Sequence, residues 1–297
     1  MLQFVLDTLL RTADLALVAL GLSMVYGLAR FPNVAHVQYA LVGAYAAYAV
    51  QAMGGNLAAG VLLSCLATGA LAVLLGMAVF DRLLRAGPAY AMIGSLAVSM
   101  LLIALVLGLA GSAPRSYPLA IAAPMALGRA RIAPLQLAAI AASAAIVGLY
   151  ALMLFRSRLG RALRAIASNR ALASACGLNV AACTAATHFL SGMLAAFGGA
   201  MLAMNTGAHV NLGNDLLLPV FAAAVLGGLG NPLGAVFGAL LIAATETAFT
   251  SVNVGWLWGE PVGFLPVGYI GAASFAILLL ALVLRPHGLF DREVRRV

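Results

Sequence analysis

The chain contains few charged residues and no lysine. Only 8% of its 297 residues are charged, whereas 64% are hydrophobic. Soluble globular proteins have about 25% charged residues, so this composition excludes a soluble domain of this length. All 16 basic residues are arginines. Because a P-loop binds nucleotide phosphates through a lysine, the sequence predicts that this chain is not itself a P-loop ATPase.

Cysteine is scarce as well. Cys65, Cys176 and Cys183 form an odd, scattered set, which predicts neither a disulfide framework nor a metal site. His188 and Ser191 are close in sequence, but a hydrolase pair would also need a third orienting group and an oxyanion site. We therefore expect these two side chains to make hydrogen bonds between helices. We predict no catalytic residue, no metal ligand and no enzymatic activity of the chain's own.

Long apolar runs dominate the chain instead. A helix needs about 20 apolar residues to cross a bilayer, and about eight to ten such runs are present. The sequence predicts an all-α fold, a polytopic transmembrane helical bundle that forms one transmembrane domain over residues 1–297. The expected spans, two of them short or broken, are 9–28, 37–50, 57–80, 90–110, 135–155, 181–205, 216–229, 233–252 and 264–284.

One interior segment, residues 156–180, is too basic to lie in lipid. It holds Arg156, Arg158, Arg161, Arg164 and Arg170. Arginine is retained on the cytoplasmic side of a membrane, and most of the 16 basic residues fall in loops on the same side as this segment. We therefore expect the basic tail, residues 285–297, in the cytoplasm and the N-terminus outside. The net charge of +8 is then explained by arginines in the cytoplasmic loops, and no nucleic-acid binding is expected.

The same segment predicts a short helix on the cytoplasmic surface. Asn169 or the preceding Ser168 can cap its start, and Gly177 can end it in a left-handed conformation, which leaves about two turns over residues 170–176. Upstream, three arginines share one helical face: Arg158, Arg161 and Arg164. Two interpretations stay open: a basic loop held against anionic lipid headgroups, or a docking helix for a cytoplasmic partner.

Two stretches interrupt the apolar pattern. The first contains Pro32, and the second is formed by Gly230, Asn231 and Pro232. Breaks inside a membrane domain expose helix ends and free carbonyls to a cavity, and two of them suggest an architecture of two halves. The alternative for each is a tight turn. Next to the first break lie polar candidates for a solute pathway, with a helix cap as the alternative role for the histidine: Asn33, His36 and Gln38.

Glu246 is the acidic residue expected deepest inside a span. Ionisable groups within the membrane are costly and usually face the interior of the bundle. Glu246 could contact a substrate ammonium group or pair with an arginine of a partner subunit. The alternative is a packed, protonated side chain near the outer interface. Asp215 is expected at a helix start, where a carboxylate is favourable, and we interpret it as a cap.

Five stretches, in order along nearly the whole chain, resemble permease subunits of branched-chain amino acid ABC importers. LGRALRAIASN at 159–169, followed by GLNV at 177–180, is similar to the cytoplasmic coupling loop of that family. The resemblance assigns ATPase coupling to Leu159, Gly160, Arg161, Arg164, Asn169 and Gly177, beside Arg158. It adds Tyr45 to the pathway candidates. The other matches are NVAH with GAY at 33–36 and 43–45, FAAAVLGG at 221–228, GGLGNPLGAVFG at 227–238 and LRPHGLF at 284–290.

The resemblance implies a transport subunit without a cofactor of its own. Its expected partners are a second homologous permease, two cytoplasmic ATP-binding-cassette ATPases that carry ATP and Mg, and a periplasmic or lipid-anchored amino-acid-binding protein, besides membrane lipid. It implies the plasma (inner) membrane of a prokaryote and a branched-chain or similar hydrophobic amino acid as the solute.

The chain departs from the family pattern at three positions. Ala171 replaces an acidic residue of the coupling loop, Val37 replaces a glycine, and Pro219 replaces a lysine, so the solute need not be leucine, isoleucine or valine. The alternative function is a passive channel or secondary transporter for a small neutral solute. The docking helix discriminates between them, because a channel has no use for one.

Overall fold

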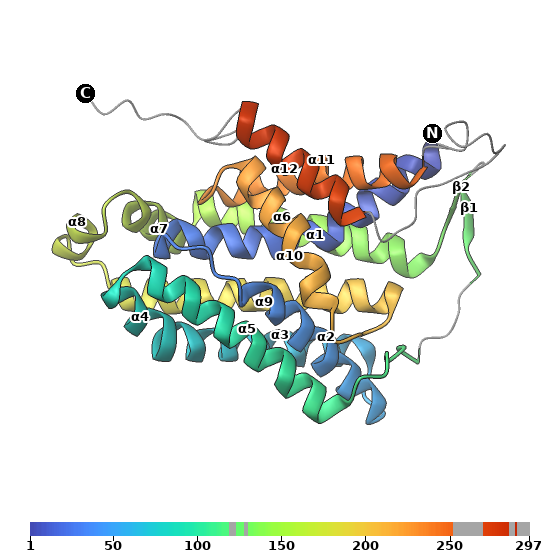
Figure 1. The fold of residues 1–297 in the computed structure, drawn as a ribbon, viewed down its shortest axis with the longest axis horizontal. Coiled ribbons are helices and arrows are strands. Elements are labelled where there is room, and N and C mark those ends of the chain that lie inside the picture. Colours follow the sequence, from blue (N-terminus) through green and yellow to red (C-terminus); the bar gives the residue numbers. More distant parts are fainter. Residues whose placement is uncertain (119–122, 128–129, 252–269, 285–288, 290–297) are drawn as a thin grey trace.

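The computed structural model describes residues 1–118, 123–127, 130–251, 270–284 and 289, and these are largely helical (Figure 1). The polytopic helical bundle is confirmed. One antiparallel hairpin was not predicted from the sequence, and in it β1 (Met125–Leu127) pairs with β2 (Ala130–Ile132). The helices are α1 (Leu2–Ala29), α2 (His36–Ala52), α3 (Leu57–Leu75), the π-helix η1 (Gly76–Phe80), α4 (Asp81–Ala86), α5 (Pro88–Ala110), α6 (Pro134–Arg156), α7 (Arg158–Ser168), α8 (Arg170–Ala175), α9 (Val180–Thr206), α10 (Leu212–Gly227), α11 (Pro232–Ser251) and α12 (Ile270–Leu284).

Six of the described helical stretches are long and apolar enough to cross a membrane. They are α1, α3 with η1 and α4, α5, α6, α9 and α11. Two shorter apolar helices cover 212–227 and 271–280, and the first agrees with the expected short span at 216–229. The loop at 252–263 and the first residues of the last expected span, 264–269, lie outside the described residues.

Helix α1 is the centre of the bundle. In its most apolar window 72% of the residues are buried, compared with 17% in α6 and 28% in α5. It packs against α11, α9, α10 and α6. An apolar helix that is covered on all sides belongs to a core, whereas α5 and α6 leave wide apolar faces uncovered. Those uncovered faces are the surfaces available to lipid or to another subunit.

Small residues let two pairs of helices touch through their backbones. Where α2 crosses α9, a Cβ atom added to Gly199 would lie 2.1 Å from the carbonyl oxygen of Ala40. Where α10 crosses α11, a Cβ atom added to Gly238 would lie 2.0 Å from the carbonyl oxygen of Ala223. Close packing through small residues is the usual way in which helices associate in lipid.

The bundle has two opposite ends, which we call the hairpin end and the α8 end (Figure 1). At the hairpin end, the Arg131 N–H donates to the Gln3 side-chain oxygen over 3.0 Å, which ties β2 to the start of α1. At the α8 end, the Arg30 guanidinium donates to the Ala167 carbonyl over 2.7 Å. The N-terminus and α8 therefore lie at opposite ends. Of the expected tail only Leu289 is described, and its N–H donates to the Leu226 carbonyl over 2.8 Å.

The first predicted break lies inside the bundle. Helix α1 ends at Ala29, and Arg30 adopts a left-handed conformation with φ 56°. The chain then turns back, so that His36 Nε2 lies 3.1 Å from the Val18 carbonyl oxygen. From Val18 to the end of α1 is about 16 Å at 1.5 Å per residue. Helix α2 therefore begins well inside the bundle, as the interpretation of an internal break requires.

The second predicted break is a tight turn at the α8 end. Gly228 and Gly230 have φ values of 93° and 89°, and the Asn231 side-chain oxygen caps α11 by accepting from the Gly234 N–H over 3.1 Å. Gly230 touches Gly27, near the end of α1. The stretch is thus a tight turn, and its residues also line a hollow of about 260 Å³ between α1, α6, α7 and the start of α11.

Besides α9 and α3, helix α2 contacts α10. The Gln38 amide donates to the Asn214 side-chain oxygen over 3.0 Å, so the first turns of α2 and α10 meet within the bundle. A second helix start therefore lies inside the bundle, and the sequence did not predict it. Gly-Asn-Pro is a strong turn signal. No comparable sequence signal marks the start of α10, which lies inside the bundle and not at its end.

The basic segment contains two helices instead of one. Helix α8 matches the prediction: Asn169 caps it by accepting from the Leu172 N–H over 3.0 Å, and Gly177 has φ 82°. The upstream arginines belong to a second helix, α7, whose start is capped by Ser157. Leu163 and Ile166 of α7 are buried against the bundle, and this burial explains why the basic stretch folds as a helix.

Candidate functional site

The segment α7–α8 covers one end of the bundle and presents a basic outer surface. Its inward side chains are apolar and buried, whereas Leu172 on α8 is 61% exposed. Gly160 permits the close approach of α7 to the end of α6, because a Cβ atom there would lie 2.1 Å from the Leu154 carbonyl oxygen. Leu159 is half-buried beside it. The outward side chains include four of the predicted arginines: Arg158, Arg161, Arg164 and Arg170.

Two of these arginines also have a structural role. The Arg164 guanidinium donates to the Leu154 carbonyl, and that of Arg161 donates to the Arg156 carbonyl over 3.5 Å. Arg164 also lies over the Phe155 ring, 5.8 Å from its centroid. The last carbonyls of a helix have no partners within it, so these contacts close the end of α6. Arg158 has no such contact within the described residues, which leaves its charge free for a partner.

Replacing Arg164 with glutamine is expected to loosen the junction of α6 and α7. A hydrogen bond from a charged donor contributes about 1.5–3 kcal/mol, and we expect a loss of that order in stability. The measurement is thermal unfolding of the purified chain in detergent, together with protease cleavage at residues 156–158. The matched variant Arg158→Gln removes the same charge without that contact, so equal destabilisation by both would contradict the assignment.

His36 is a buried connection between three helices. Its side chain is fully buried. Nε2 donates to the Val18 carbonyl of α1 over 3.1 Å, and Nδ1 lies 3.2 Å from the Ser191 hydroxyl of α9. Both ring nitrogens are thus engaged, and Ser191 makes the interhelical hydrogen bond that the sequence predicted for it. A role of His36 in solute passage stays a prediction.

Gln38 and Tyr45 connect α2 to the segment that precedes and begins α10. Besides the bond from Gln38 to Asn214, the Tyr45 hydroxyl donates to the Ala208 carbonyl over 3.4 Å. Ala208 pairs in turn with Arg115 through two backbone hydrogen bonds of 2.8 Å. The two predicted pathway residues are therefore brought to neighbouring places, but both side chains are buried in the isolated chain.

Two of the pathway candidates keep unused hydrogen-bonding groups. Neither the oxygen nor the nitrogen of the Asn33 side chain has a hydrogen-bond partner among the described residues, and the same is true of the Gln38 oxygen. The Tyr39 hydroxyl lies beside Asn33 but also lacks a well-formed hydrogen bond. Unsatisfied buried polar groups cost about 1–3 kcal/mol each, and a role of Asn33 and Gln38 in solute passage stays a prediction.

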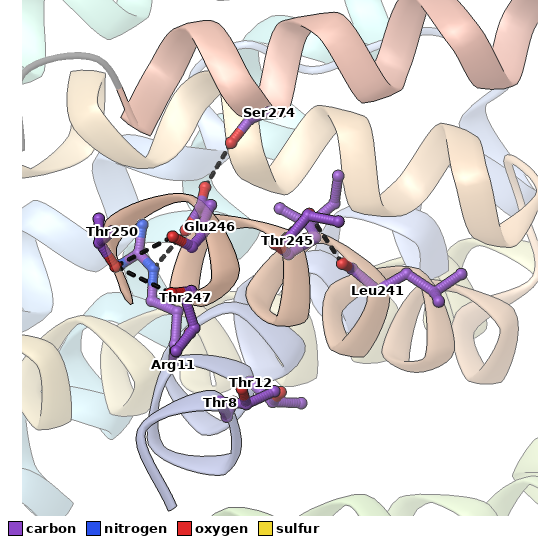
Figure 2. A network of polar contacts seen from close by, with 10 residues as sticks. Thr8, Arg11, Thr12, Leu241, Thr245, Glu246, Thr247, Thr250 and Ser274 are labelled. Carbon is purple, nitrogen blue, oxygen red and sulfur yellow. Dashed lines mark hydrogen bonds and ion pairs between the residues drawn. The ribbon is translucent and has the colours of Figure 1, made fainter. Parts of the chain in front are cut away.

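Glu246 forms an ion pair within its own chain (Figure 2). Its Oε2 accepts from the Arg11 Nε–H over 2.7 Å, and its Oε1 accepts from the Ser274 hydroxyl. Glu246 is 2% exposed and Arg11 is 26% exposed. The structure therefore places an arginine of α1 where the sequence analysis considered one of a partner subunit. Asp14, also on α1, is a second buried acid that the sequence analysis did not count.

Asp215 does not cap the start of α10. It lies in the first turn of that helix, but no side-chain cap is formed there. Its carboxylate instead lies 2.8 Å from His209 Nε2. Both side chains face away from the core, at the outer side of the place where α2 and α10 meet.

Comparison with known proteins decides the family. The family described as "Branched-chain amino acid transport system / permease component" matches residues 4–284. The chain belongs to this family. It is 28% identical to the high-affinity branched-chain amino acid transport system permease protein BraD of Pseudomonas aeruginosa, over 100% of this chain and 98% of BraD. It is 27% identical to the permease protein LivH of Escherichia coli K12, over 95% of this chain and 93% of LivH.

The solved structures agree at the level of the fold. A chain of PsaBC from Streptococcus pneumoniae in complex with a Fab superposes with a TM-score of 0.54 and 15% identity, over 96% of this chain and 92% of that one. The membership in the permease family confirms the resemblance drawn from the five sequence stretches. Together with the six apolar helices, it makes this chain a multi-pass membrane transport protein.

Several residues of these sites were not predicted. Arg11 and Ser274 complete the environment of Glu246, and Asn214 completes that of Gln38. A charged residue near the start of the first span was a usable signal for Arg11, because a buried acid in lipid calls for a basic partner. Ser274 and Asn214 carried no such signal, since each becomes a partner only through helix packing.

Proposed function

We propose that this chain is the membrane-spanning permease subunit of an ATP-driven importer for branched-chain or similar hydrophobic amino acids. The family match over residues 4–284 is the observation that carries the proposal. The proposed complex contains a second homologous permease and two ATP-binding-cassette ATPases, which bind ATP and Mg. A periplasmic or lipid-anchored binding protein delivers the solute. The membrane is the plasma (inner) membrane of a prokaryote.

The α8 end is the proposed ATPase-docking face and lies in the cytoplasm. The support is its charge and shape: exposed arginines surround α8, and Leu172 projects from it with 61% of its surface exposed. An exposed apolar residue within a polar rim is the usual centre of a protein interface. The hairpin end, with the N-terminus, then faces outward and meets the binding protein.

The proposed solute pathway begins from Asn33 and Gln38. These two side chains retain unused hydrogen-bond donors or acceptors. The side chains of His36, Tyr45 and Glu246 instead form hydrogen bonds or an ion pair within the chain. The positive ends of helices α2 and α10 meet at the same place, and helix N-termini favour negative groups. A solute carboxylate is the group that such a place would favour.

Co-purification with the ATPases tests the proposed function. Replacing Leu172 with glutamate is expected to reduce the amount of bound ATPase at least about 10-fold, because it puts a charge into the centre of the interface. Met53, which is 87% exposed at the hairpin end, provides the matched control Met53→Glu. The complex is extracted from the native host in mild detergent, and its subunits are quantified by mass spectrometry.

Uptake of labelled leucine, isoleucine and valine into vesicles with the assembled complex is the companion measurement. Import that requires both ATP and the binding protein is expected. Uptake that continues without ATP, from a chain that purifies without any ATPase, would contradict the proposal and favour the passive channel or secondary transporter.

A further inference from the structure

A hollow beside α8 contains a single carboxylate. Its volume is about 580 Å³, and it lies between the start of α4, the outer side of α8 and the first turns of α9. Asp81, the first residue of α4, is half-buried in it. The other lining residues are Arg170, Ala171, Ser174, Val180, Ala181 and Thr184.

The position of Asp81 follows from the π-helix that precedes it. A Cβ atom on Gly76 would lie 2.6 Å from the ring of His188, so η1 packs directly on α9. Helix α4 continues from η1 toward the α8 end. Asp81 therefore opens onto the surface that α8 presents to a partner, although it is almost 90 residues distant from α8 in sequence.

The charge around this hollow is otherwise positive. Of the acidic residues in the described ranges, Asp81 alone lies at the α8 end. Its carboxylate has no hydrogen bond or ion pair within those ranges, and it lies close enough to His188 of α9 to interact with that ring electrostatically. The exposed arginines of the same end include Arg82, Arg85 and Arg158 besides Arg170. A partner that covers this surface must be largely acidic, yet it must also meet one half-buried negative charge.

We propose that Asp81 receives a lysine or arginine side chain of the partner ATPase, which inserts into the hollow beside α8. This rests on the proposed function and adds a specific contact to it. Docking on α8 removes water from the hollow, and a carboxylate that loses water without gaining a cation is strongly destabilised. The hollow is large enough for one long cationic side chain, and Ser174 offers a further acceptor at its edge.

Ala171 makes the proposal testable by rescue. It lines the same hollow from the opposite element and its side chain is exposed. A carboxylate introduced there reaches the same space from α8 and can replace the one removed from α4. The charge, and not the element that carries it, is what the partner requires.

The experiment measures binding of the purified ATPase to the full-length permease in nanodiscs. Asp81→Asn is expected to weaken binding about 10-fold or more, as truncation of one member of a buried charged pair does, and Asp81→Arg to weaken it further. Asp81→Glu is expected to bind within about threefold of the unchanged chain. The double variant Asp81→Asn with Ala171→Asp is expected to recover most of the lost affinity. Asp7→Asn, at an exposed acid of the hairpin end, is the matched control.

The outcomes separate this inference from the proposed function. If the unchanged chain binds the ATPase and Asp81→Asn and Asp81→Arg bind equally well, the inference is overturned and the proposed function stands. The inference also fails if Asp81→Glu loses as much affinity as Asp81→Asn, because charge is then not the determinant. If the unchanged chain binds no ATPase at all, it is the proposed function that fails. Size-exclusion profiles identify any variant that does not fold.

Discussion

Replacing Glu246 with alanine is expected to destabilise the folded chain by about 3–5 kcal/mol. Removing one member of a buried ion pair has a cost of that size because the remaining charge loses its partner. Glu246 is 2% exposed, and its carboxylate connects Arg11 of α1 with Ser274 of α12. Its loss therefore weakens the contact of the central helix with α11 and also releases α12. The measurement is unfolding of the purified chain in mixed micelles.

Three variants make this prediction specific. Asp7→Ala removes an exposed acid from α1, near Arg11, and is expected to change stability by less than about 0.5 kcal/mol. Glu246→Gln keeps the size of the side chain and its acceptor for Ser274, so it isolates the charge. A double-mutant cycle of Arg11→Gln with Glu246→Gln measures the pair directly. A coupling energy near zero would show that the ion pair contributes nothing.

Replacing Gly199 with leucine is expected to prevent the folded bundle from forming. A Cβ atom at this position would lie 2.1 Å from the carbonyl oxygen of Ala40, and a backbone atom cannot rotate away as a side chain can. Helices α2 and α9 would have to separate, and α2 carries the four pathway candidates from Asn33 to Tyr45 on or beside it. We expect more than about 4 kcal/mol of destabilisation, at the upper limit for single substitutions.

The control for this variant is Gly148→Leu. Gly148 lies on α6, and a Cβ atom there would meet nothing within 4 Å. The amount of monodisperse protein after detergent extraction, followed by fluorescence-detected size exclusion, compares the two. Normal yield for Gly148→Leu with almost none for Gly199→Leu is expected. Similar yields would mean that the α2–α9 crossing adjusts to a larger residue.

The sequence predicted the apolar helices and the short helix α8 well, because these depend on local features. An apolar run of sufficient length specifies a span wherever it occurs. Asn169 and Gly177 specify the two ends of α8 through cap geometry that involves only neighbouring residues, and the structure has both. For the same reason Pro32 correctly marked a break in the chain.

The depth of the helices could not be predicted in this way. The residues next to His36 in sequence do not indicate that its ring contacts the carbonyl of Val18, in the middle of α1. For Gly230, Asn231 and Pro232 the sequence left a break inside the membrane domain and a tight turn as alternatives, and only the packing against Gly27 at the α8 end decided for the turn. The helix start that meets α2 is at Asn214, where the local sequence resembles an ordinary loop.

The sequence by itself thus determined the class of the protein, the order of its helices, the basic segment and, through five short motifs, its family. These properties are fixed by composition and by interactions between residues a few positions apart. Only the tertiary structure decided which polar groups are already paired. It paired Arg11 with Glu246, left Asn33 and the Gln38 oxygen without partners among the described residues, and brought Asp81 beside Ala171. Such pairings depend on how helices distant in sequence cross, and the crossing is set by side-chain packing across the whole bundle.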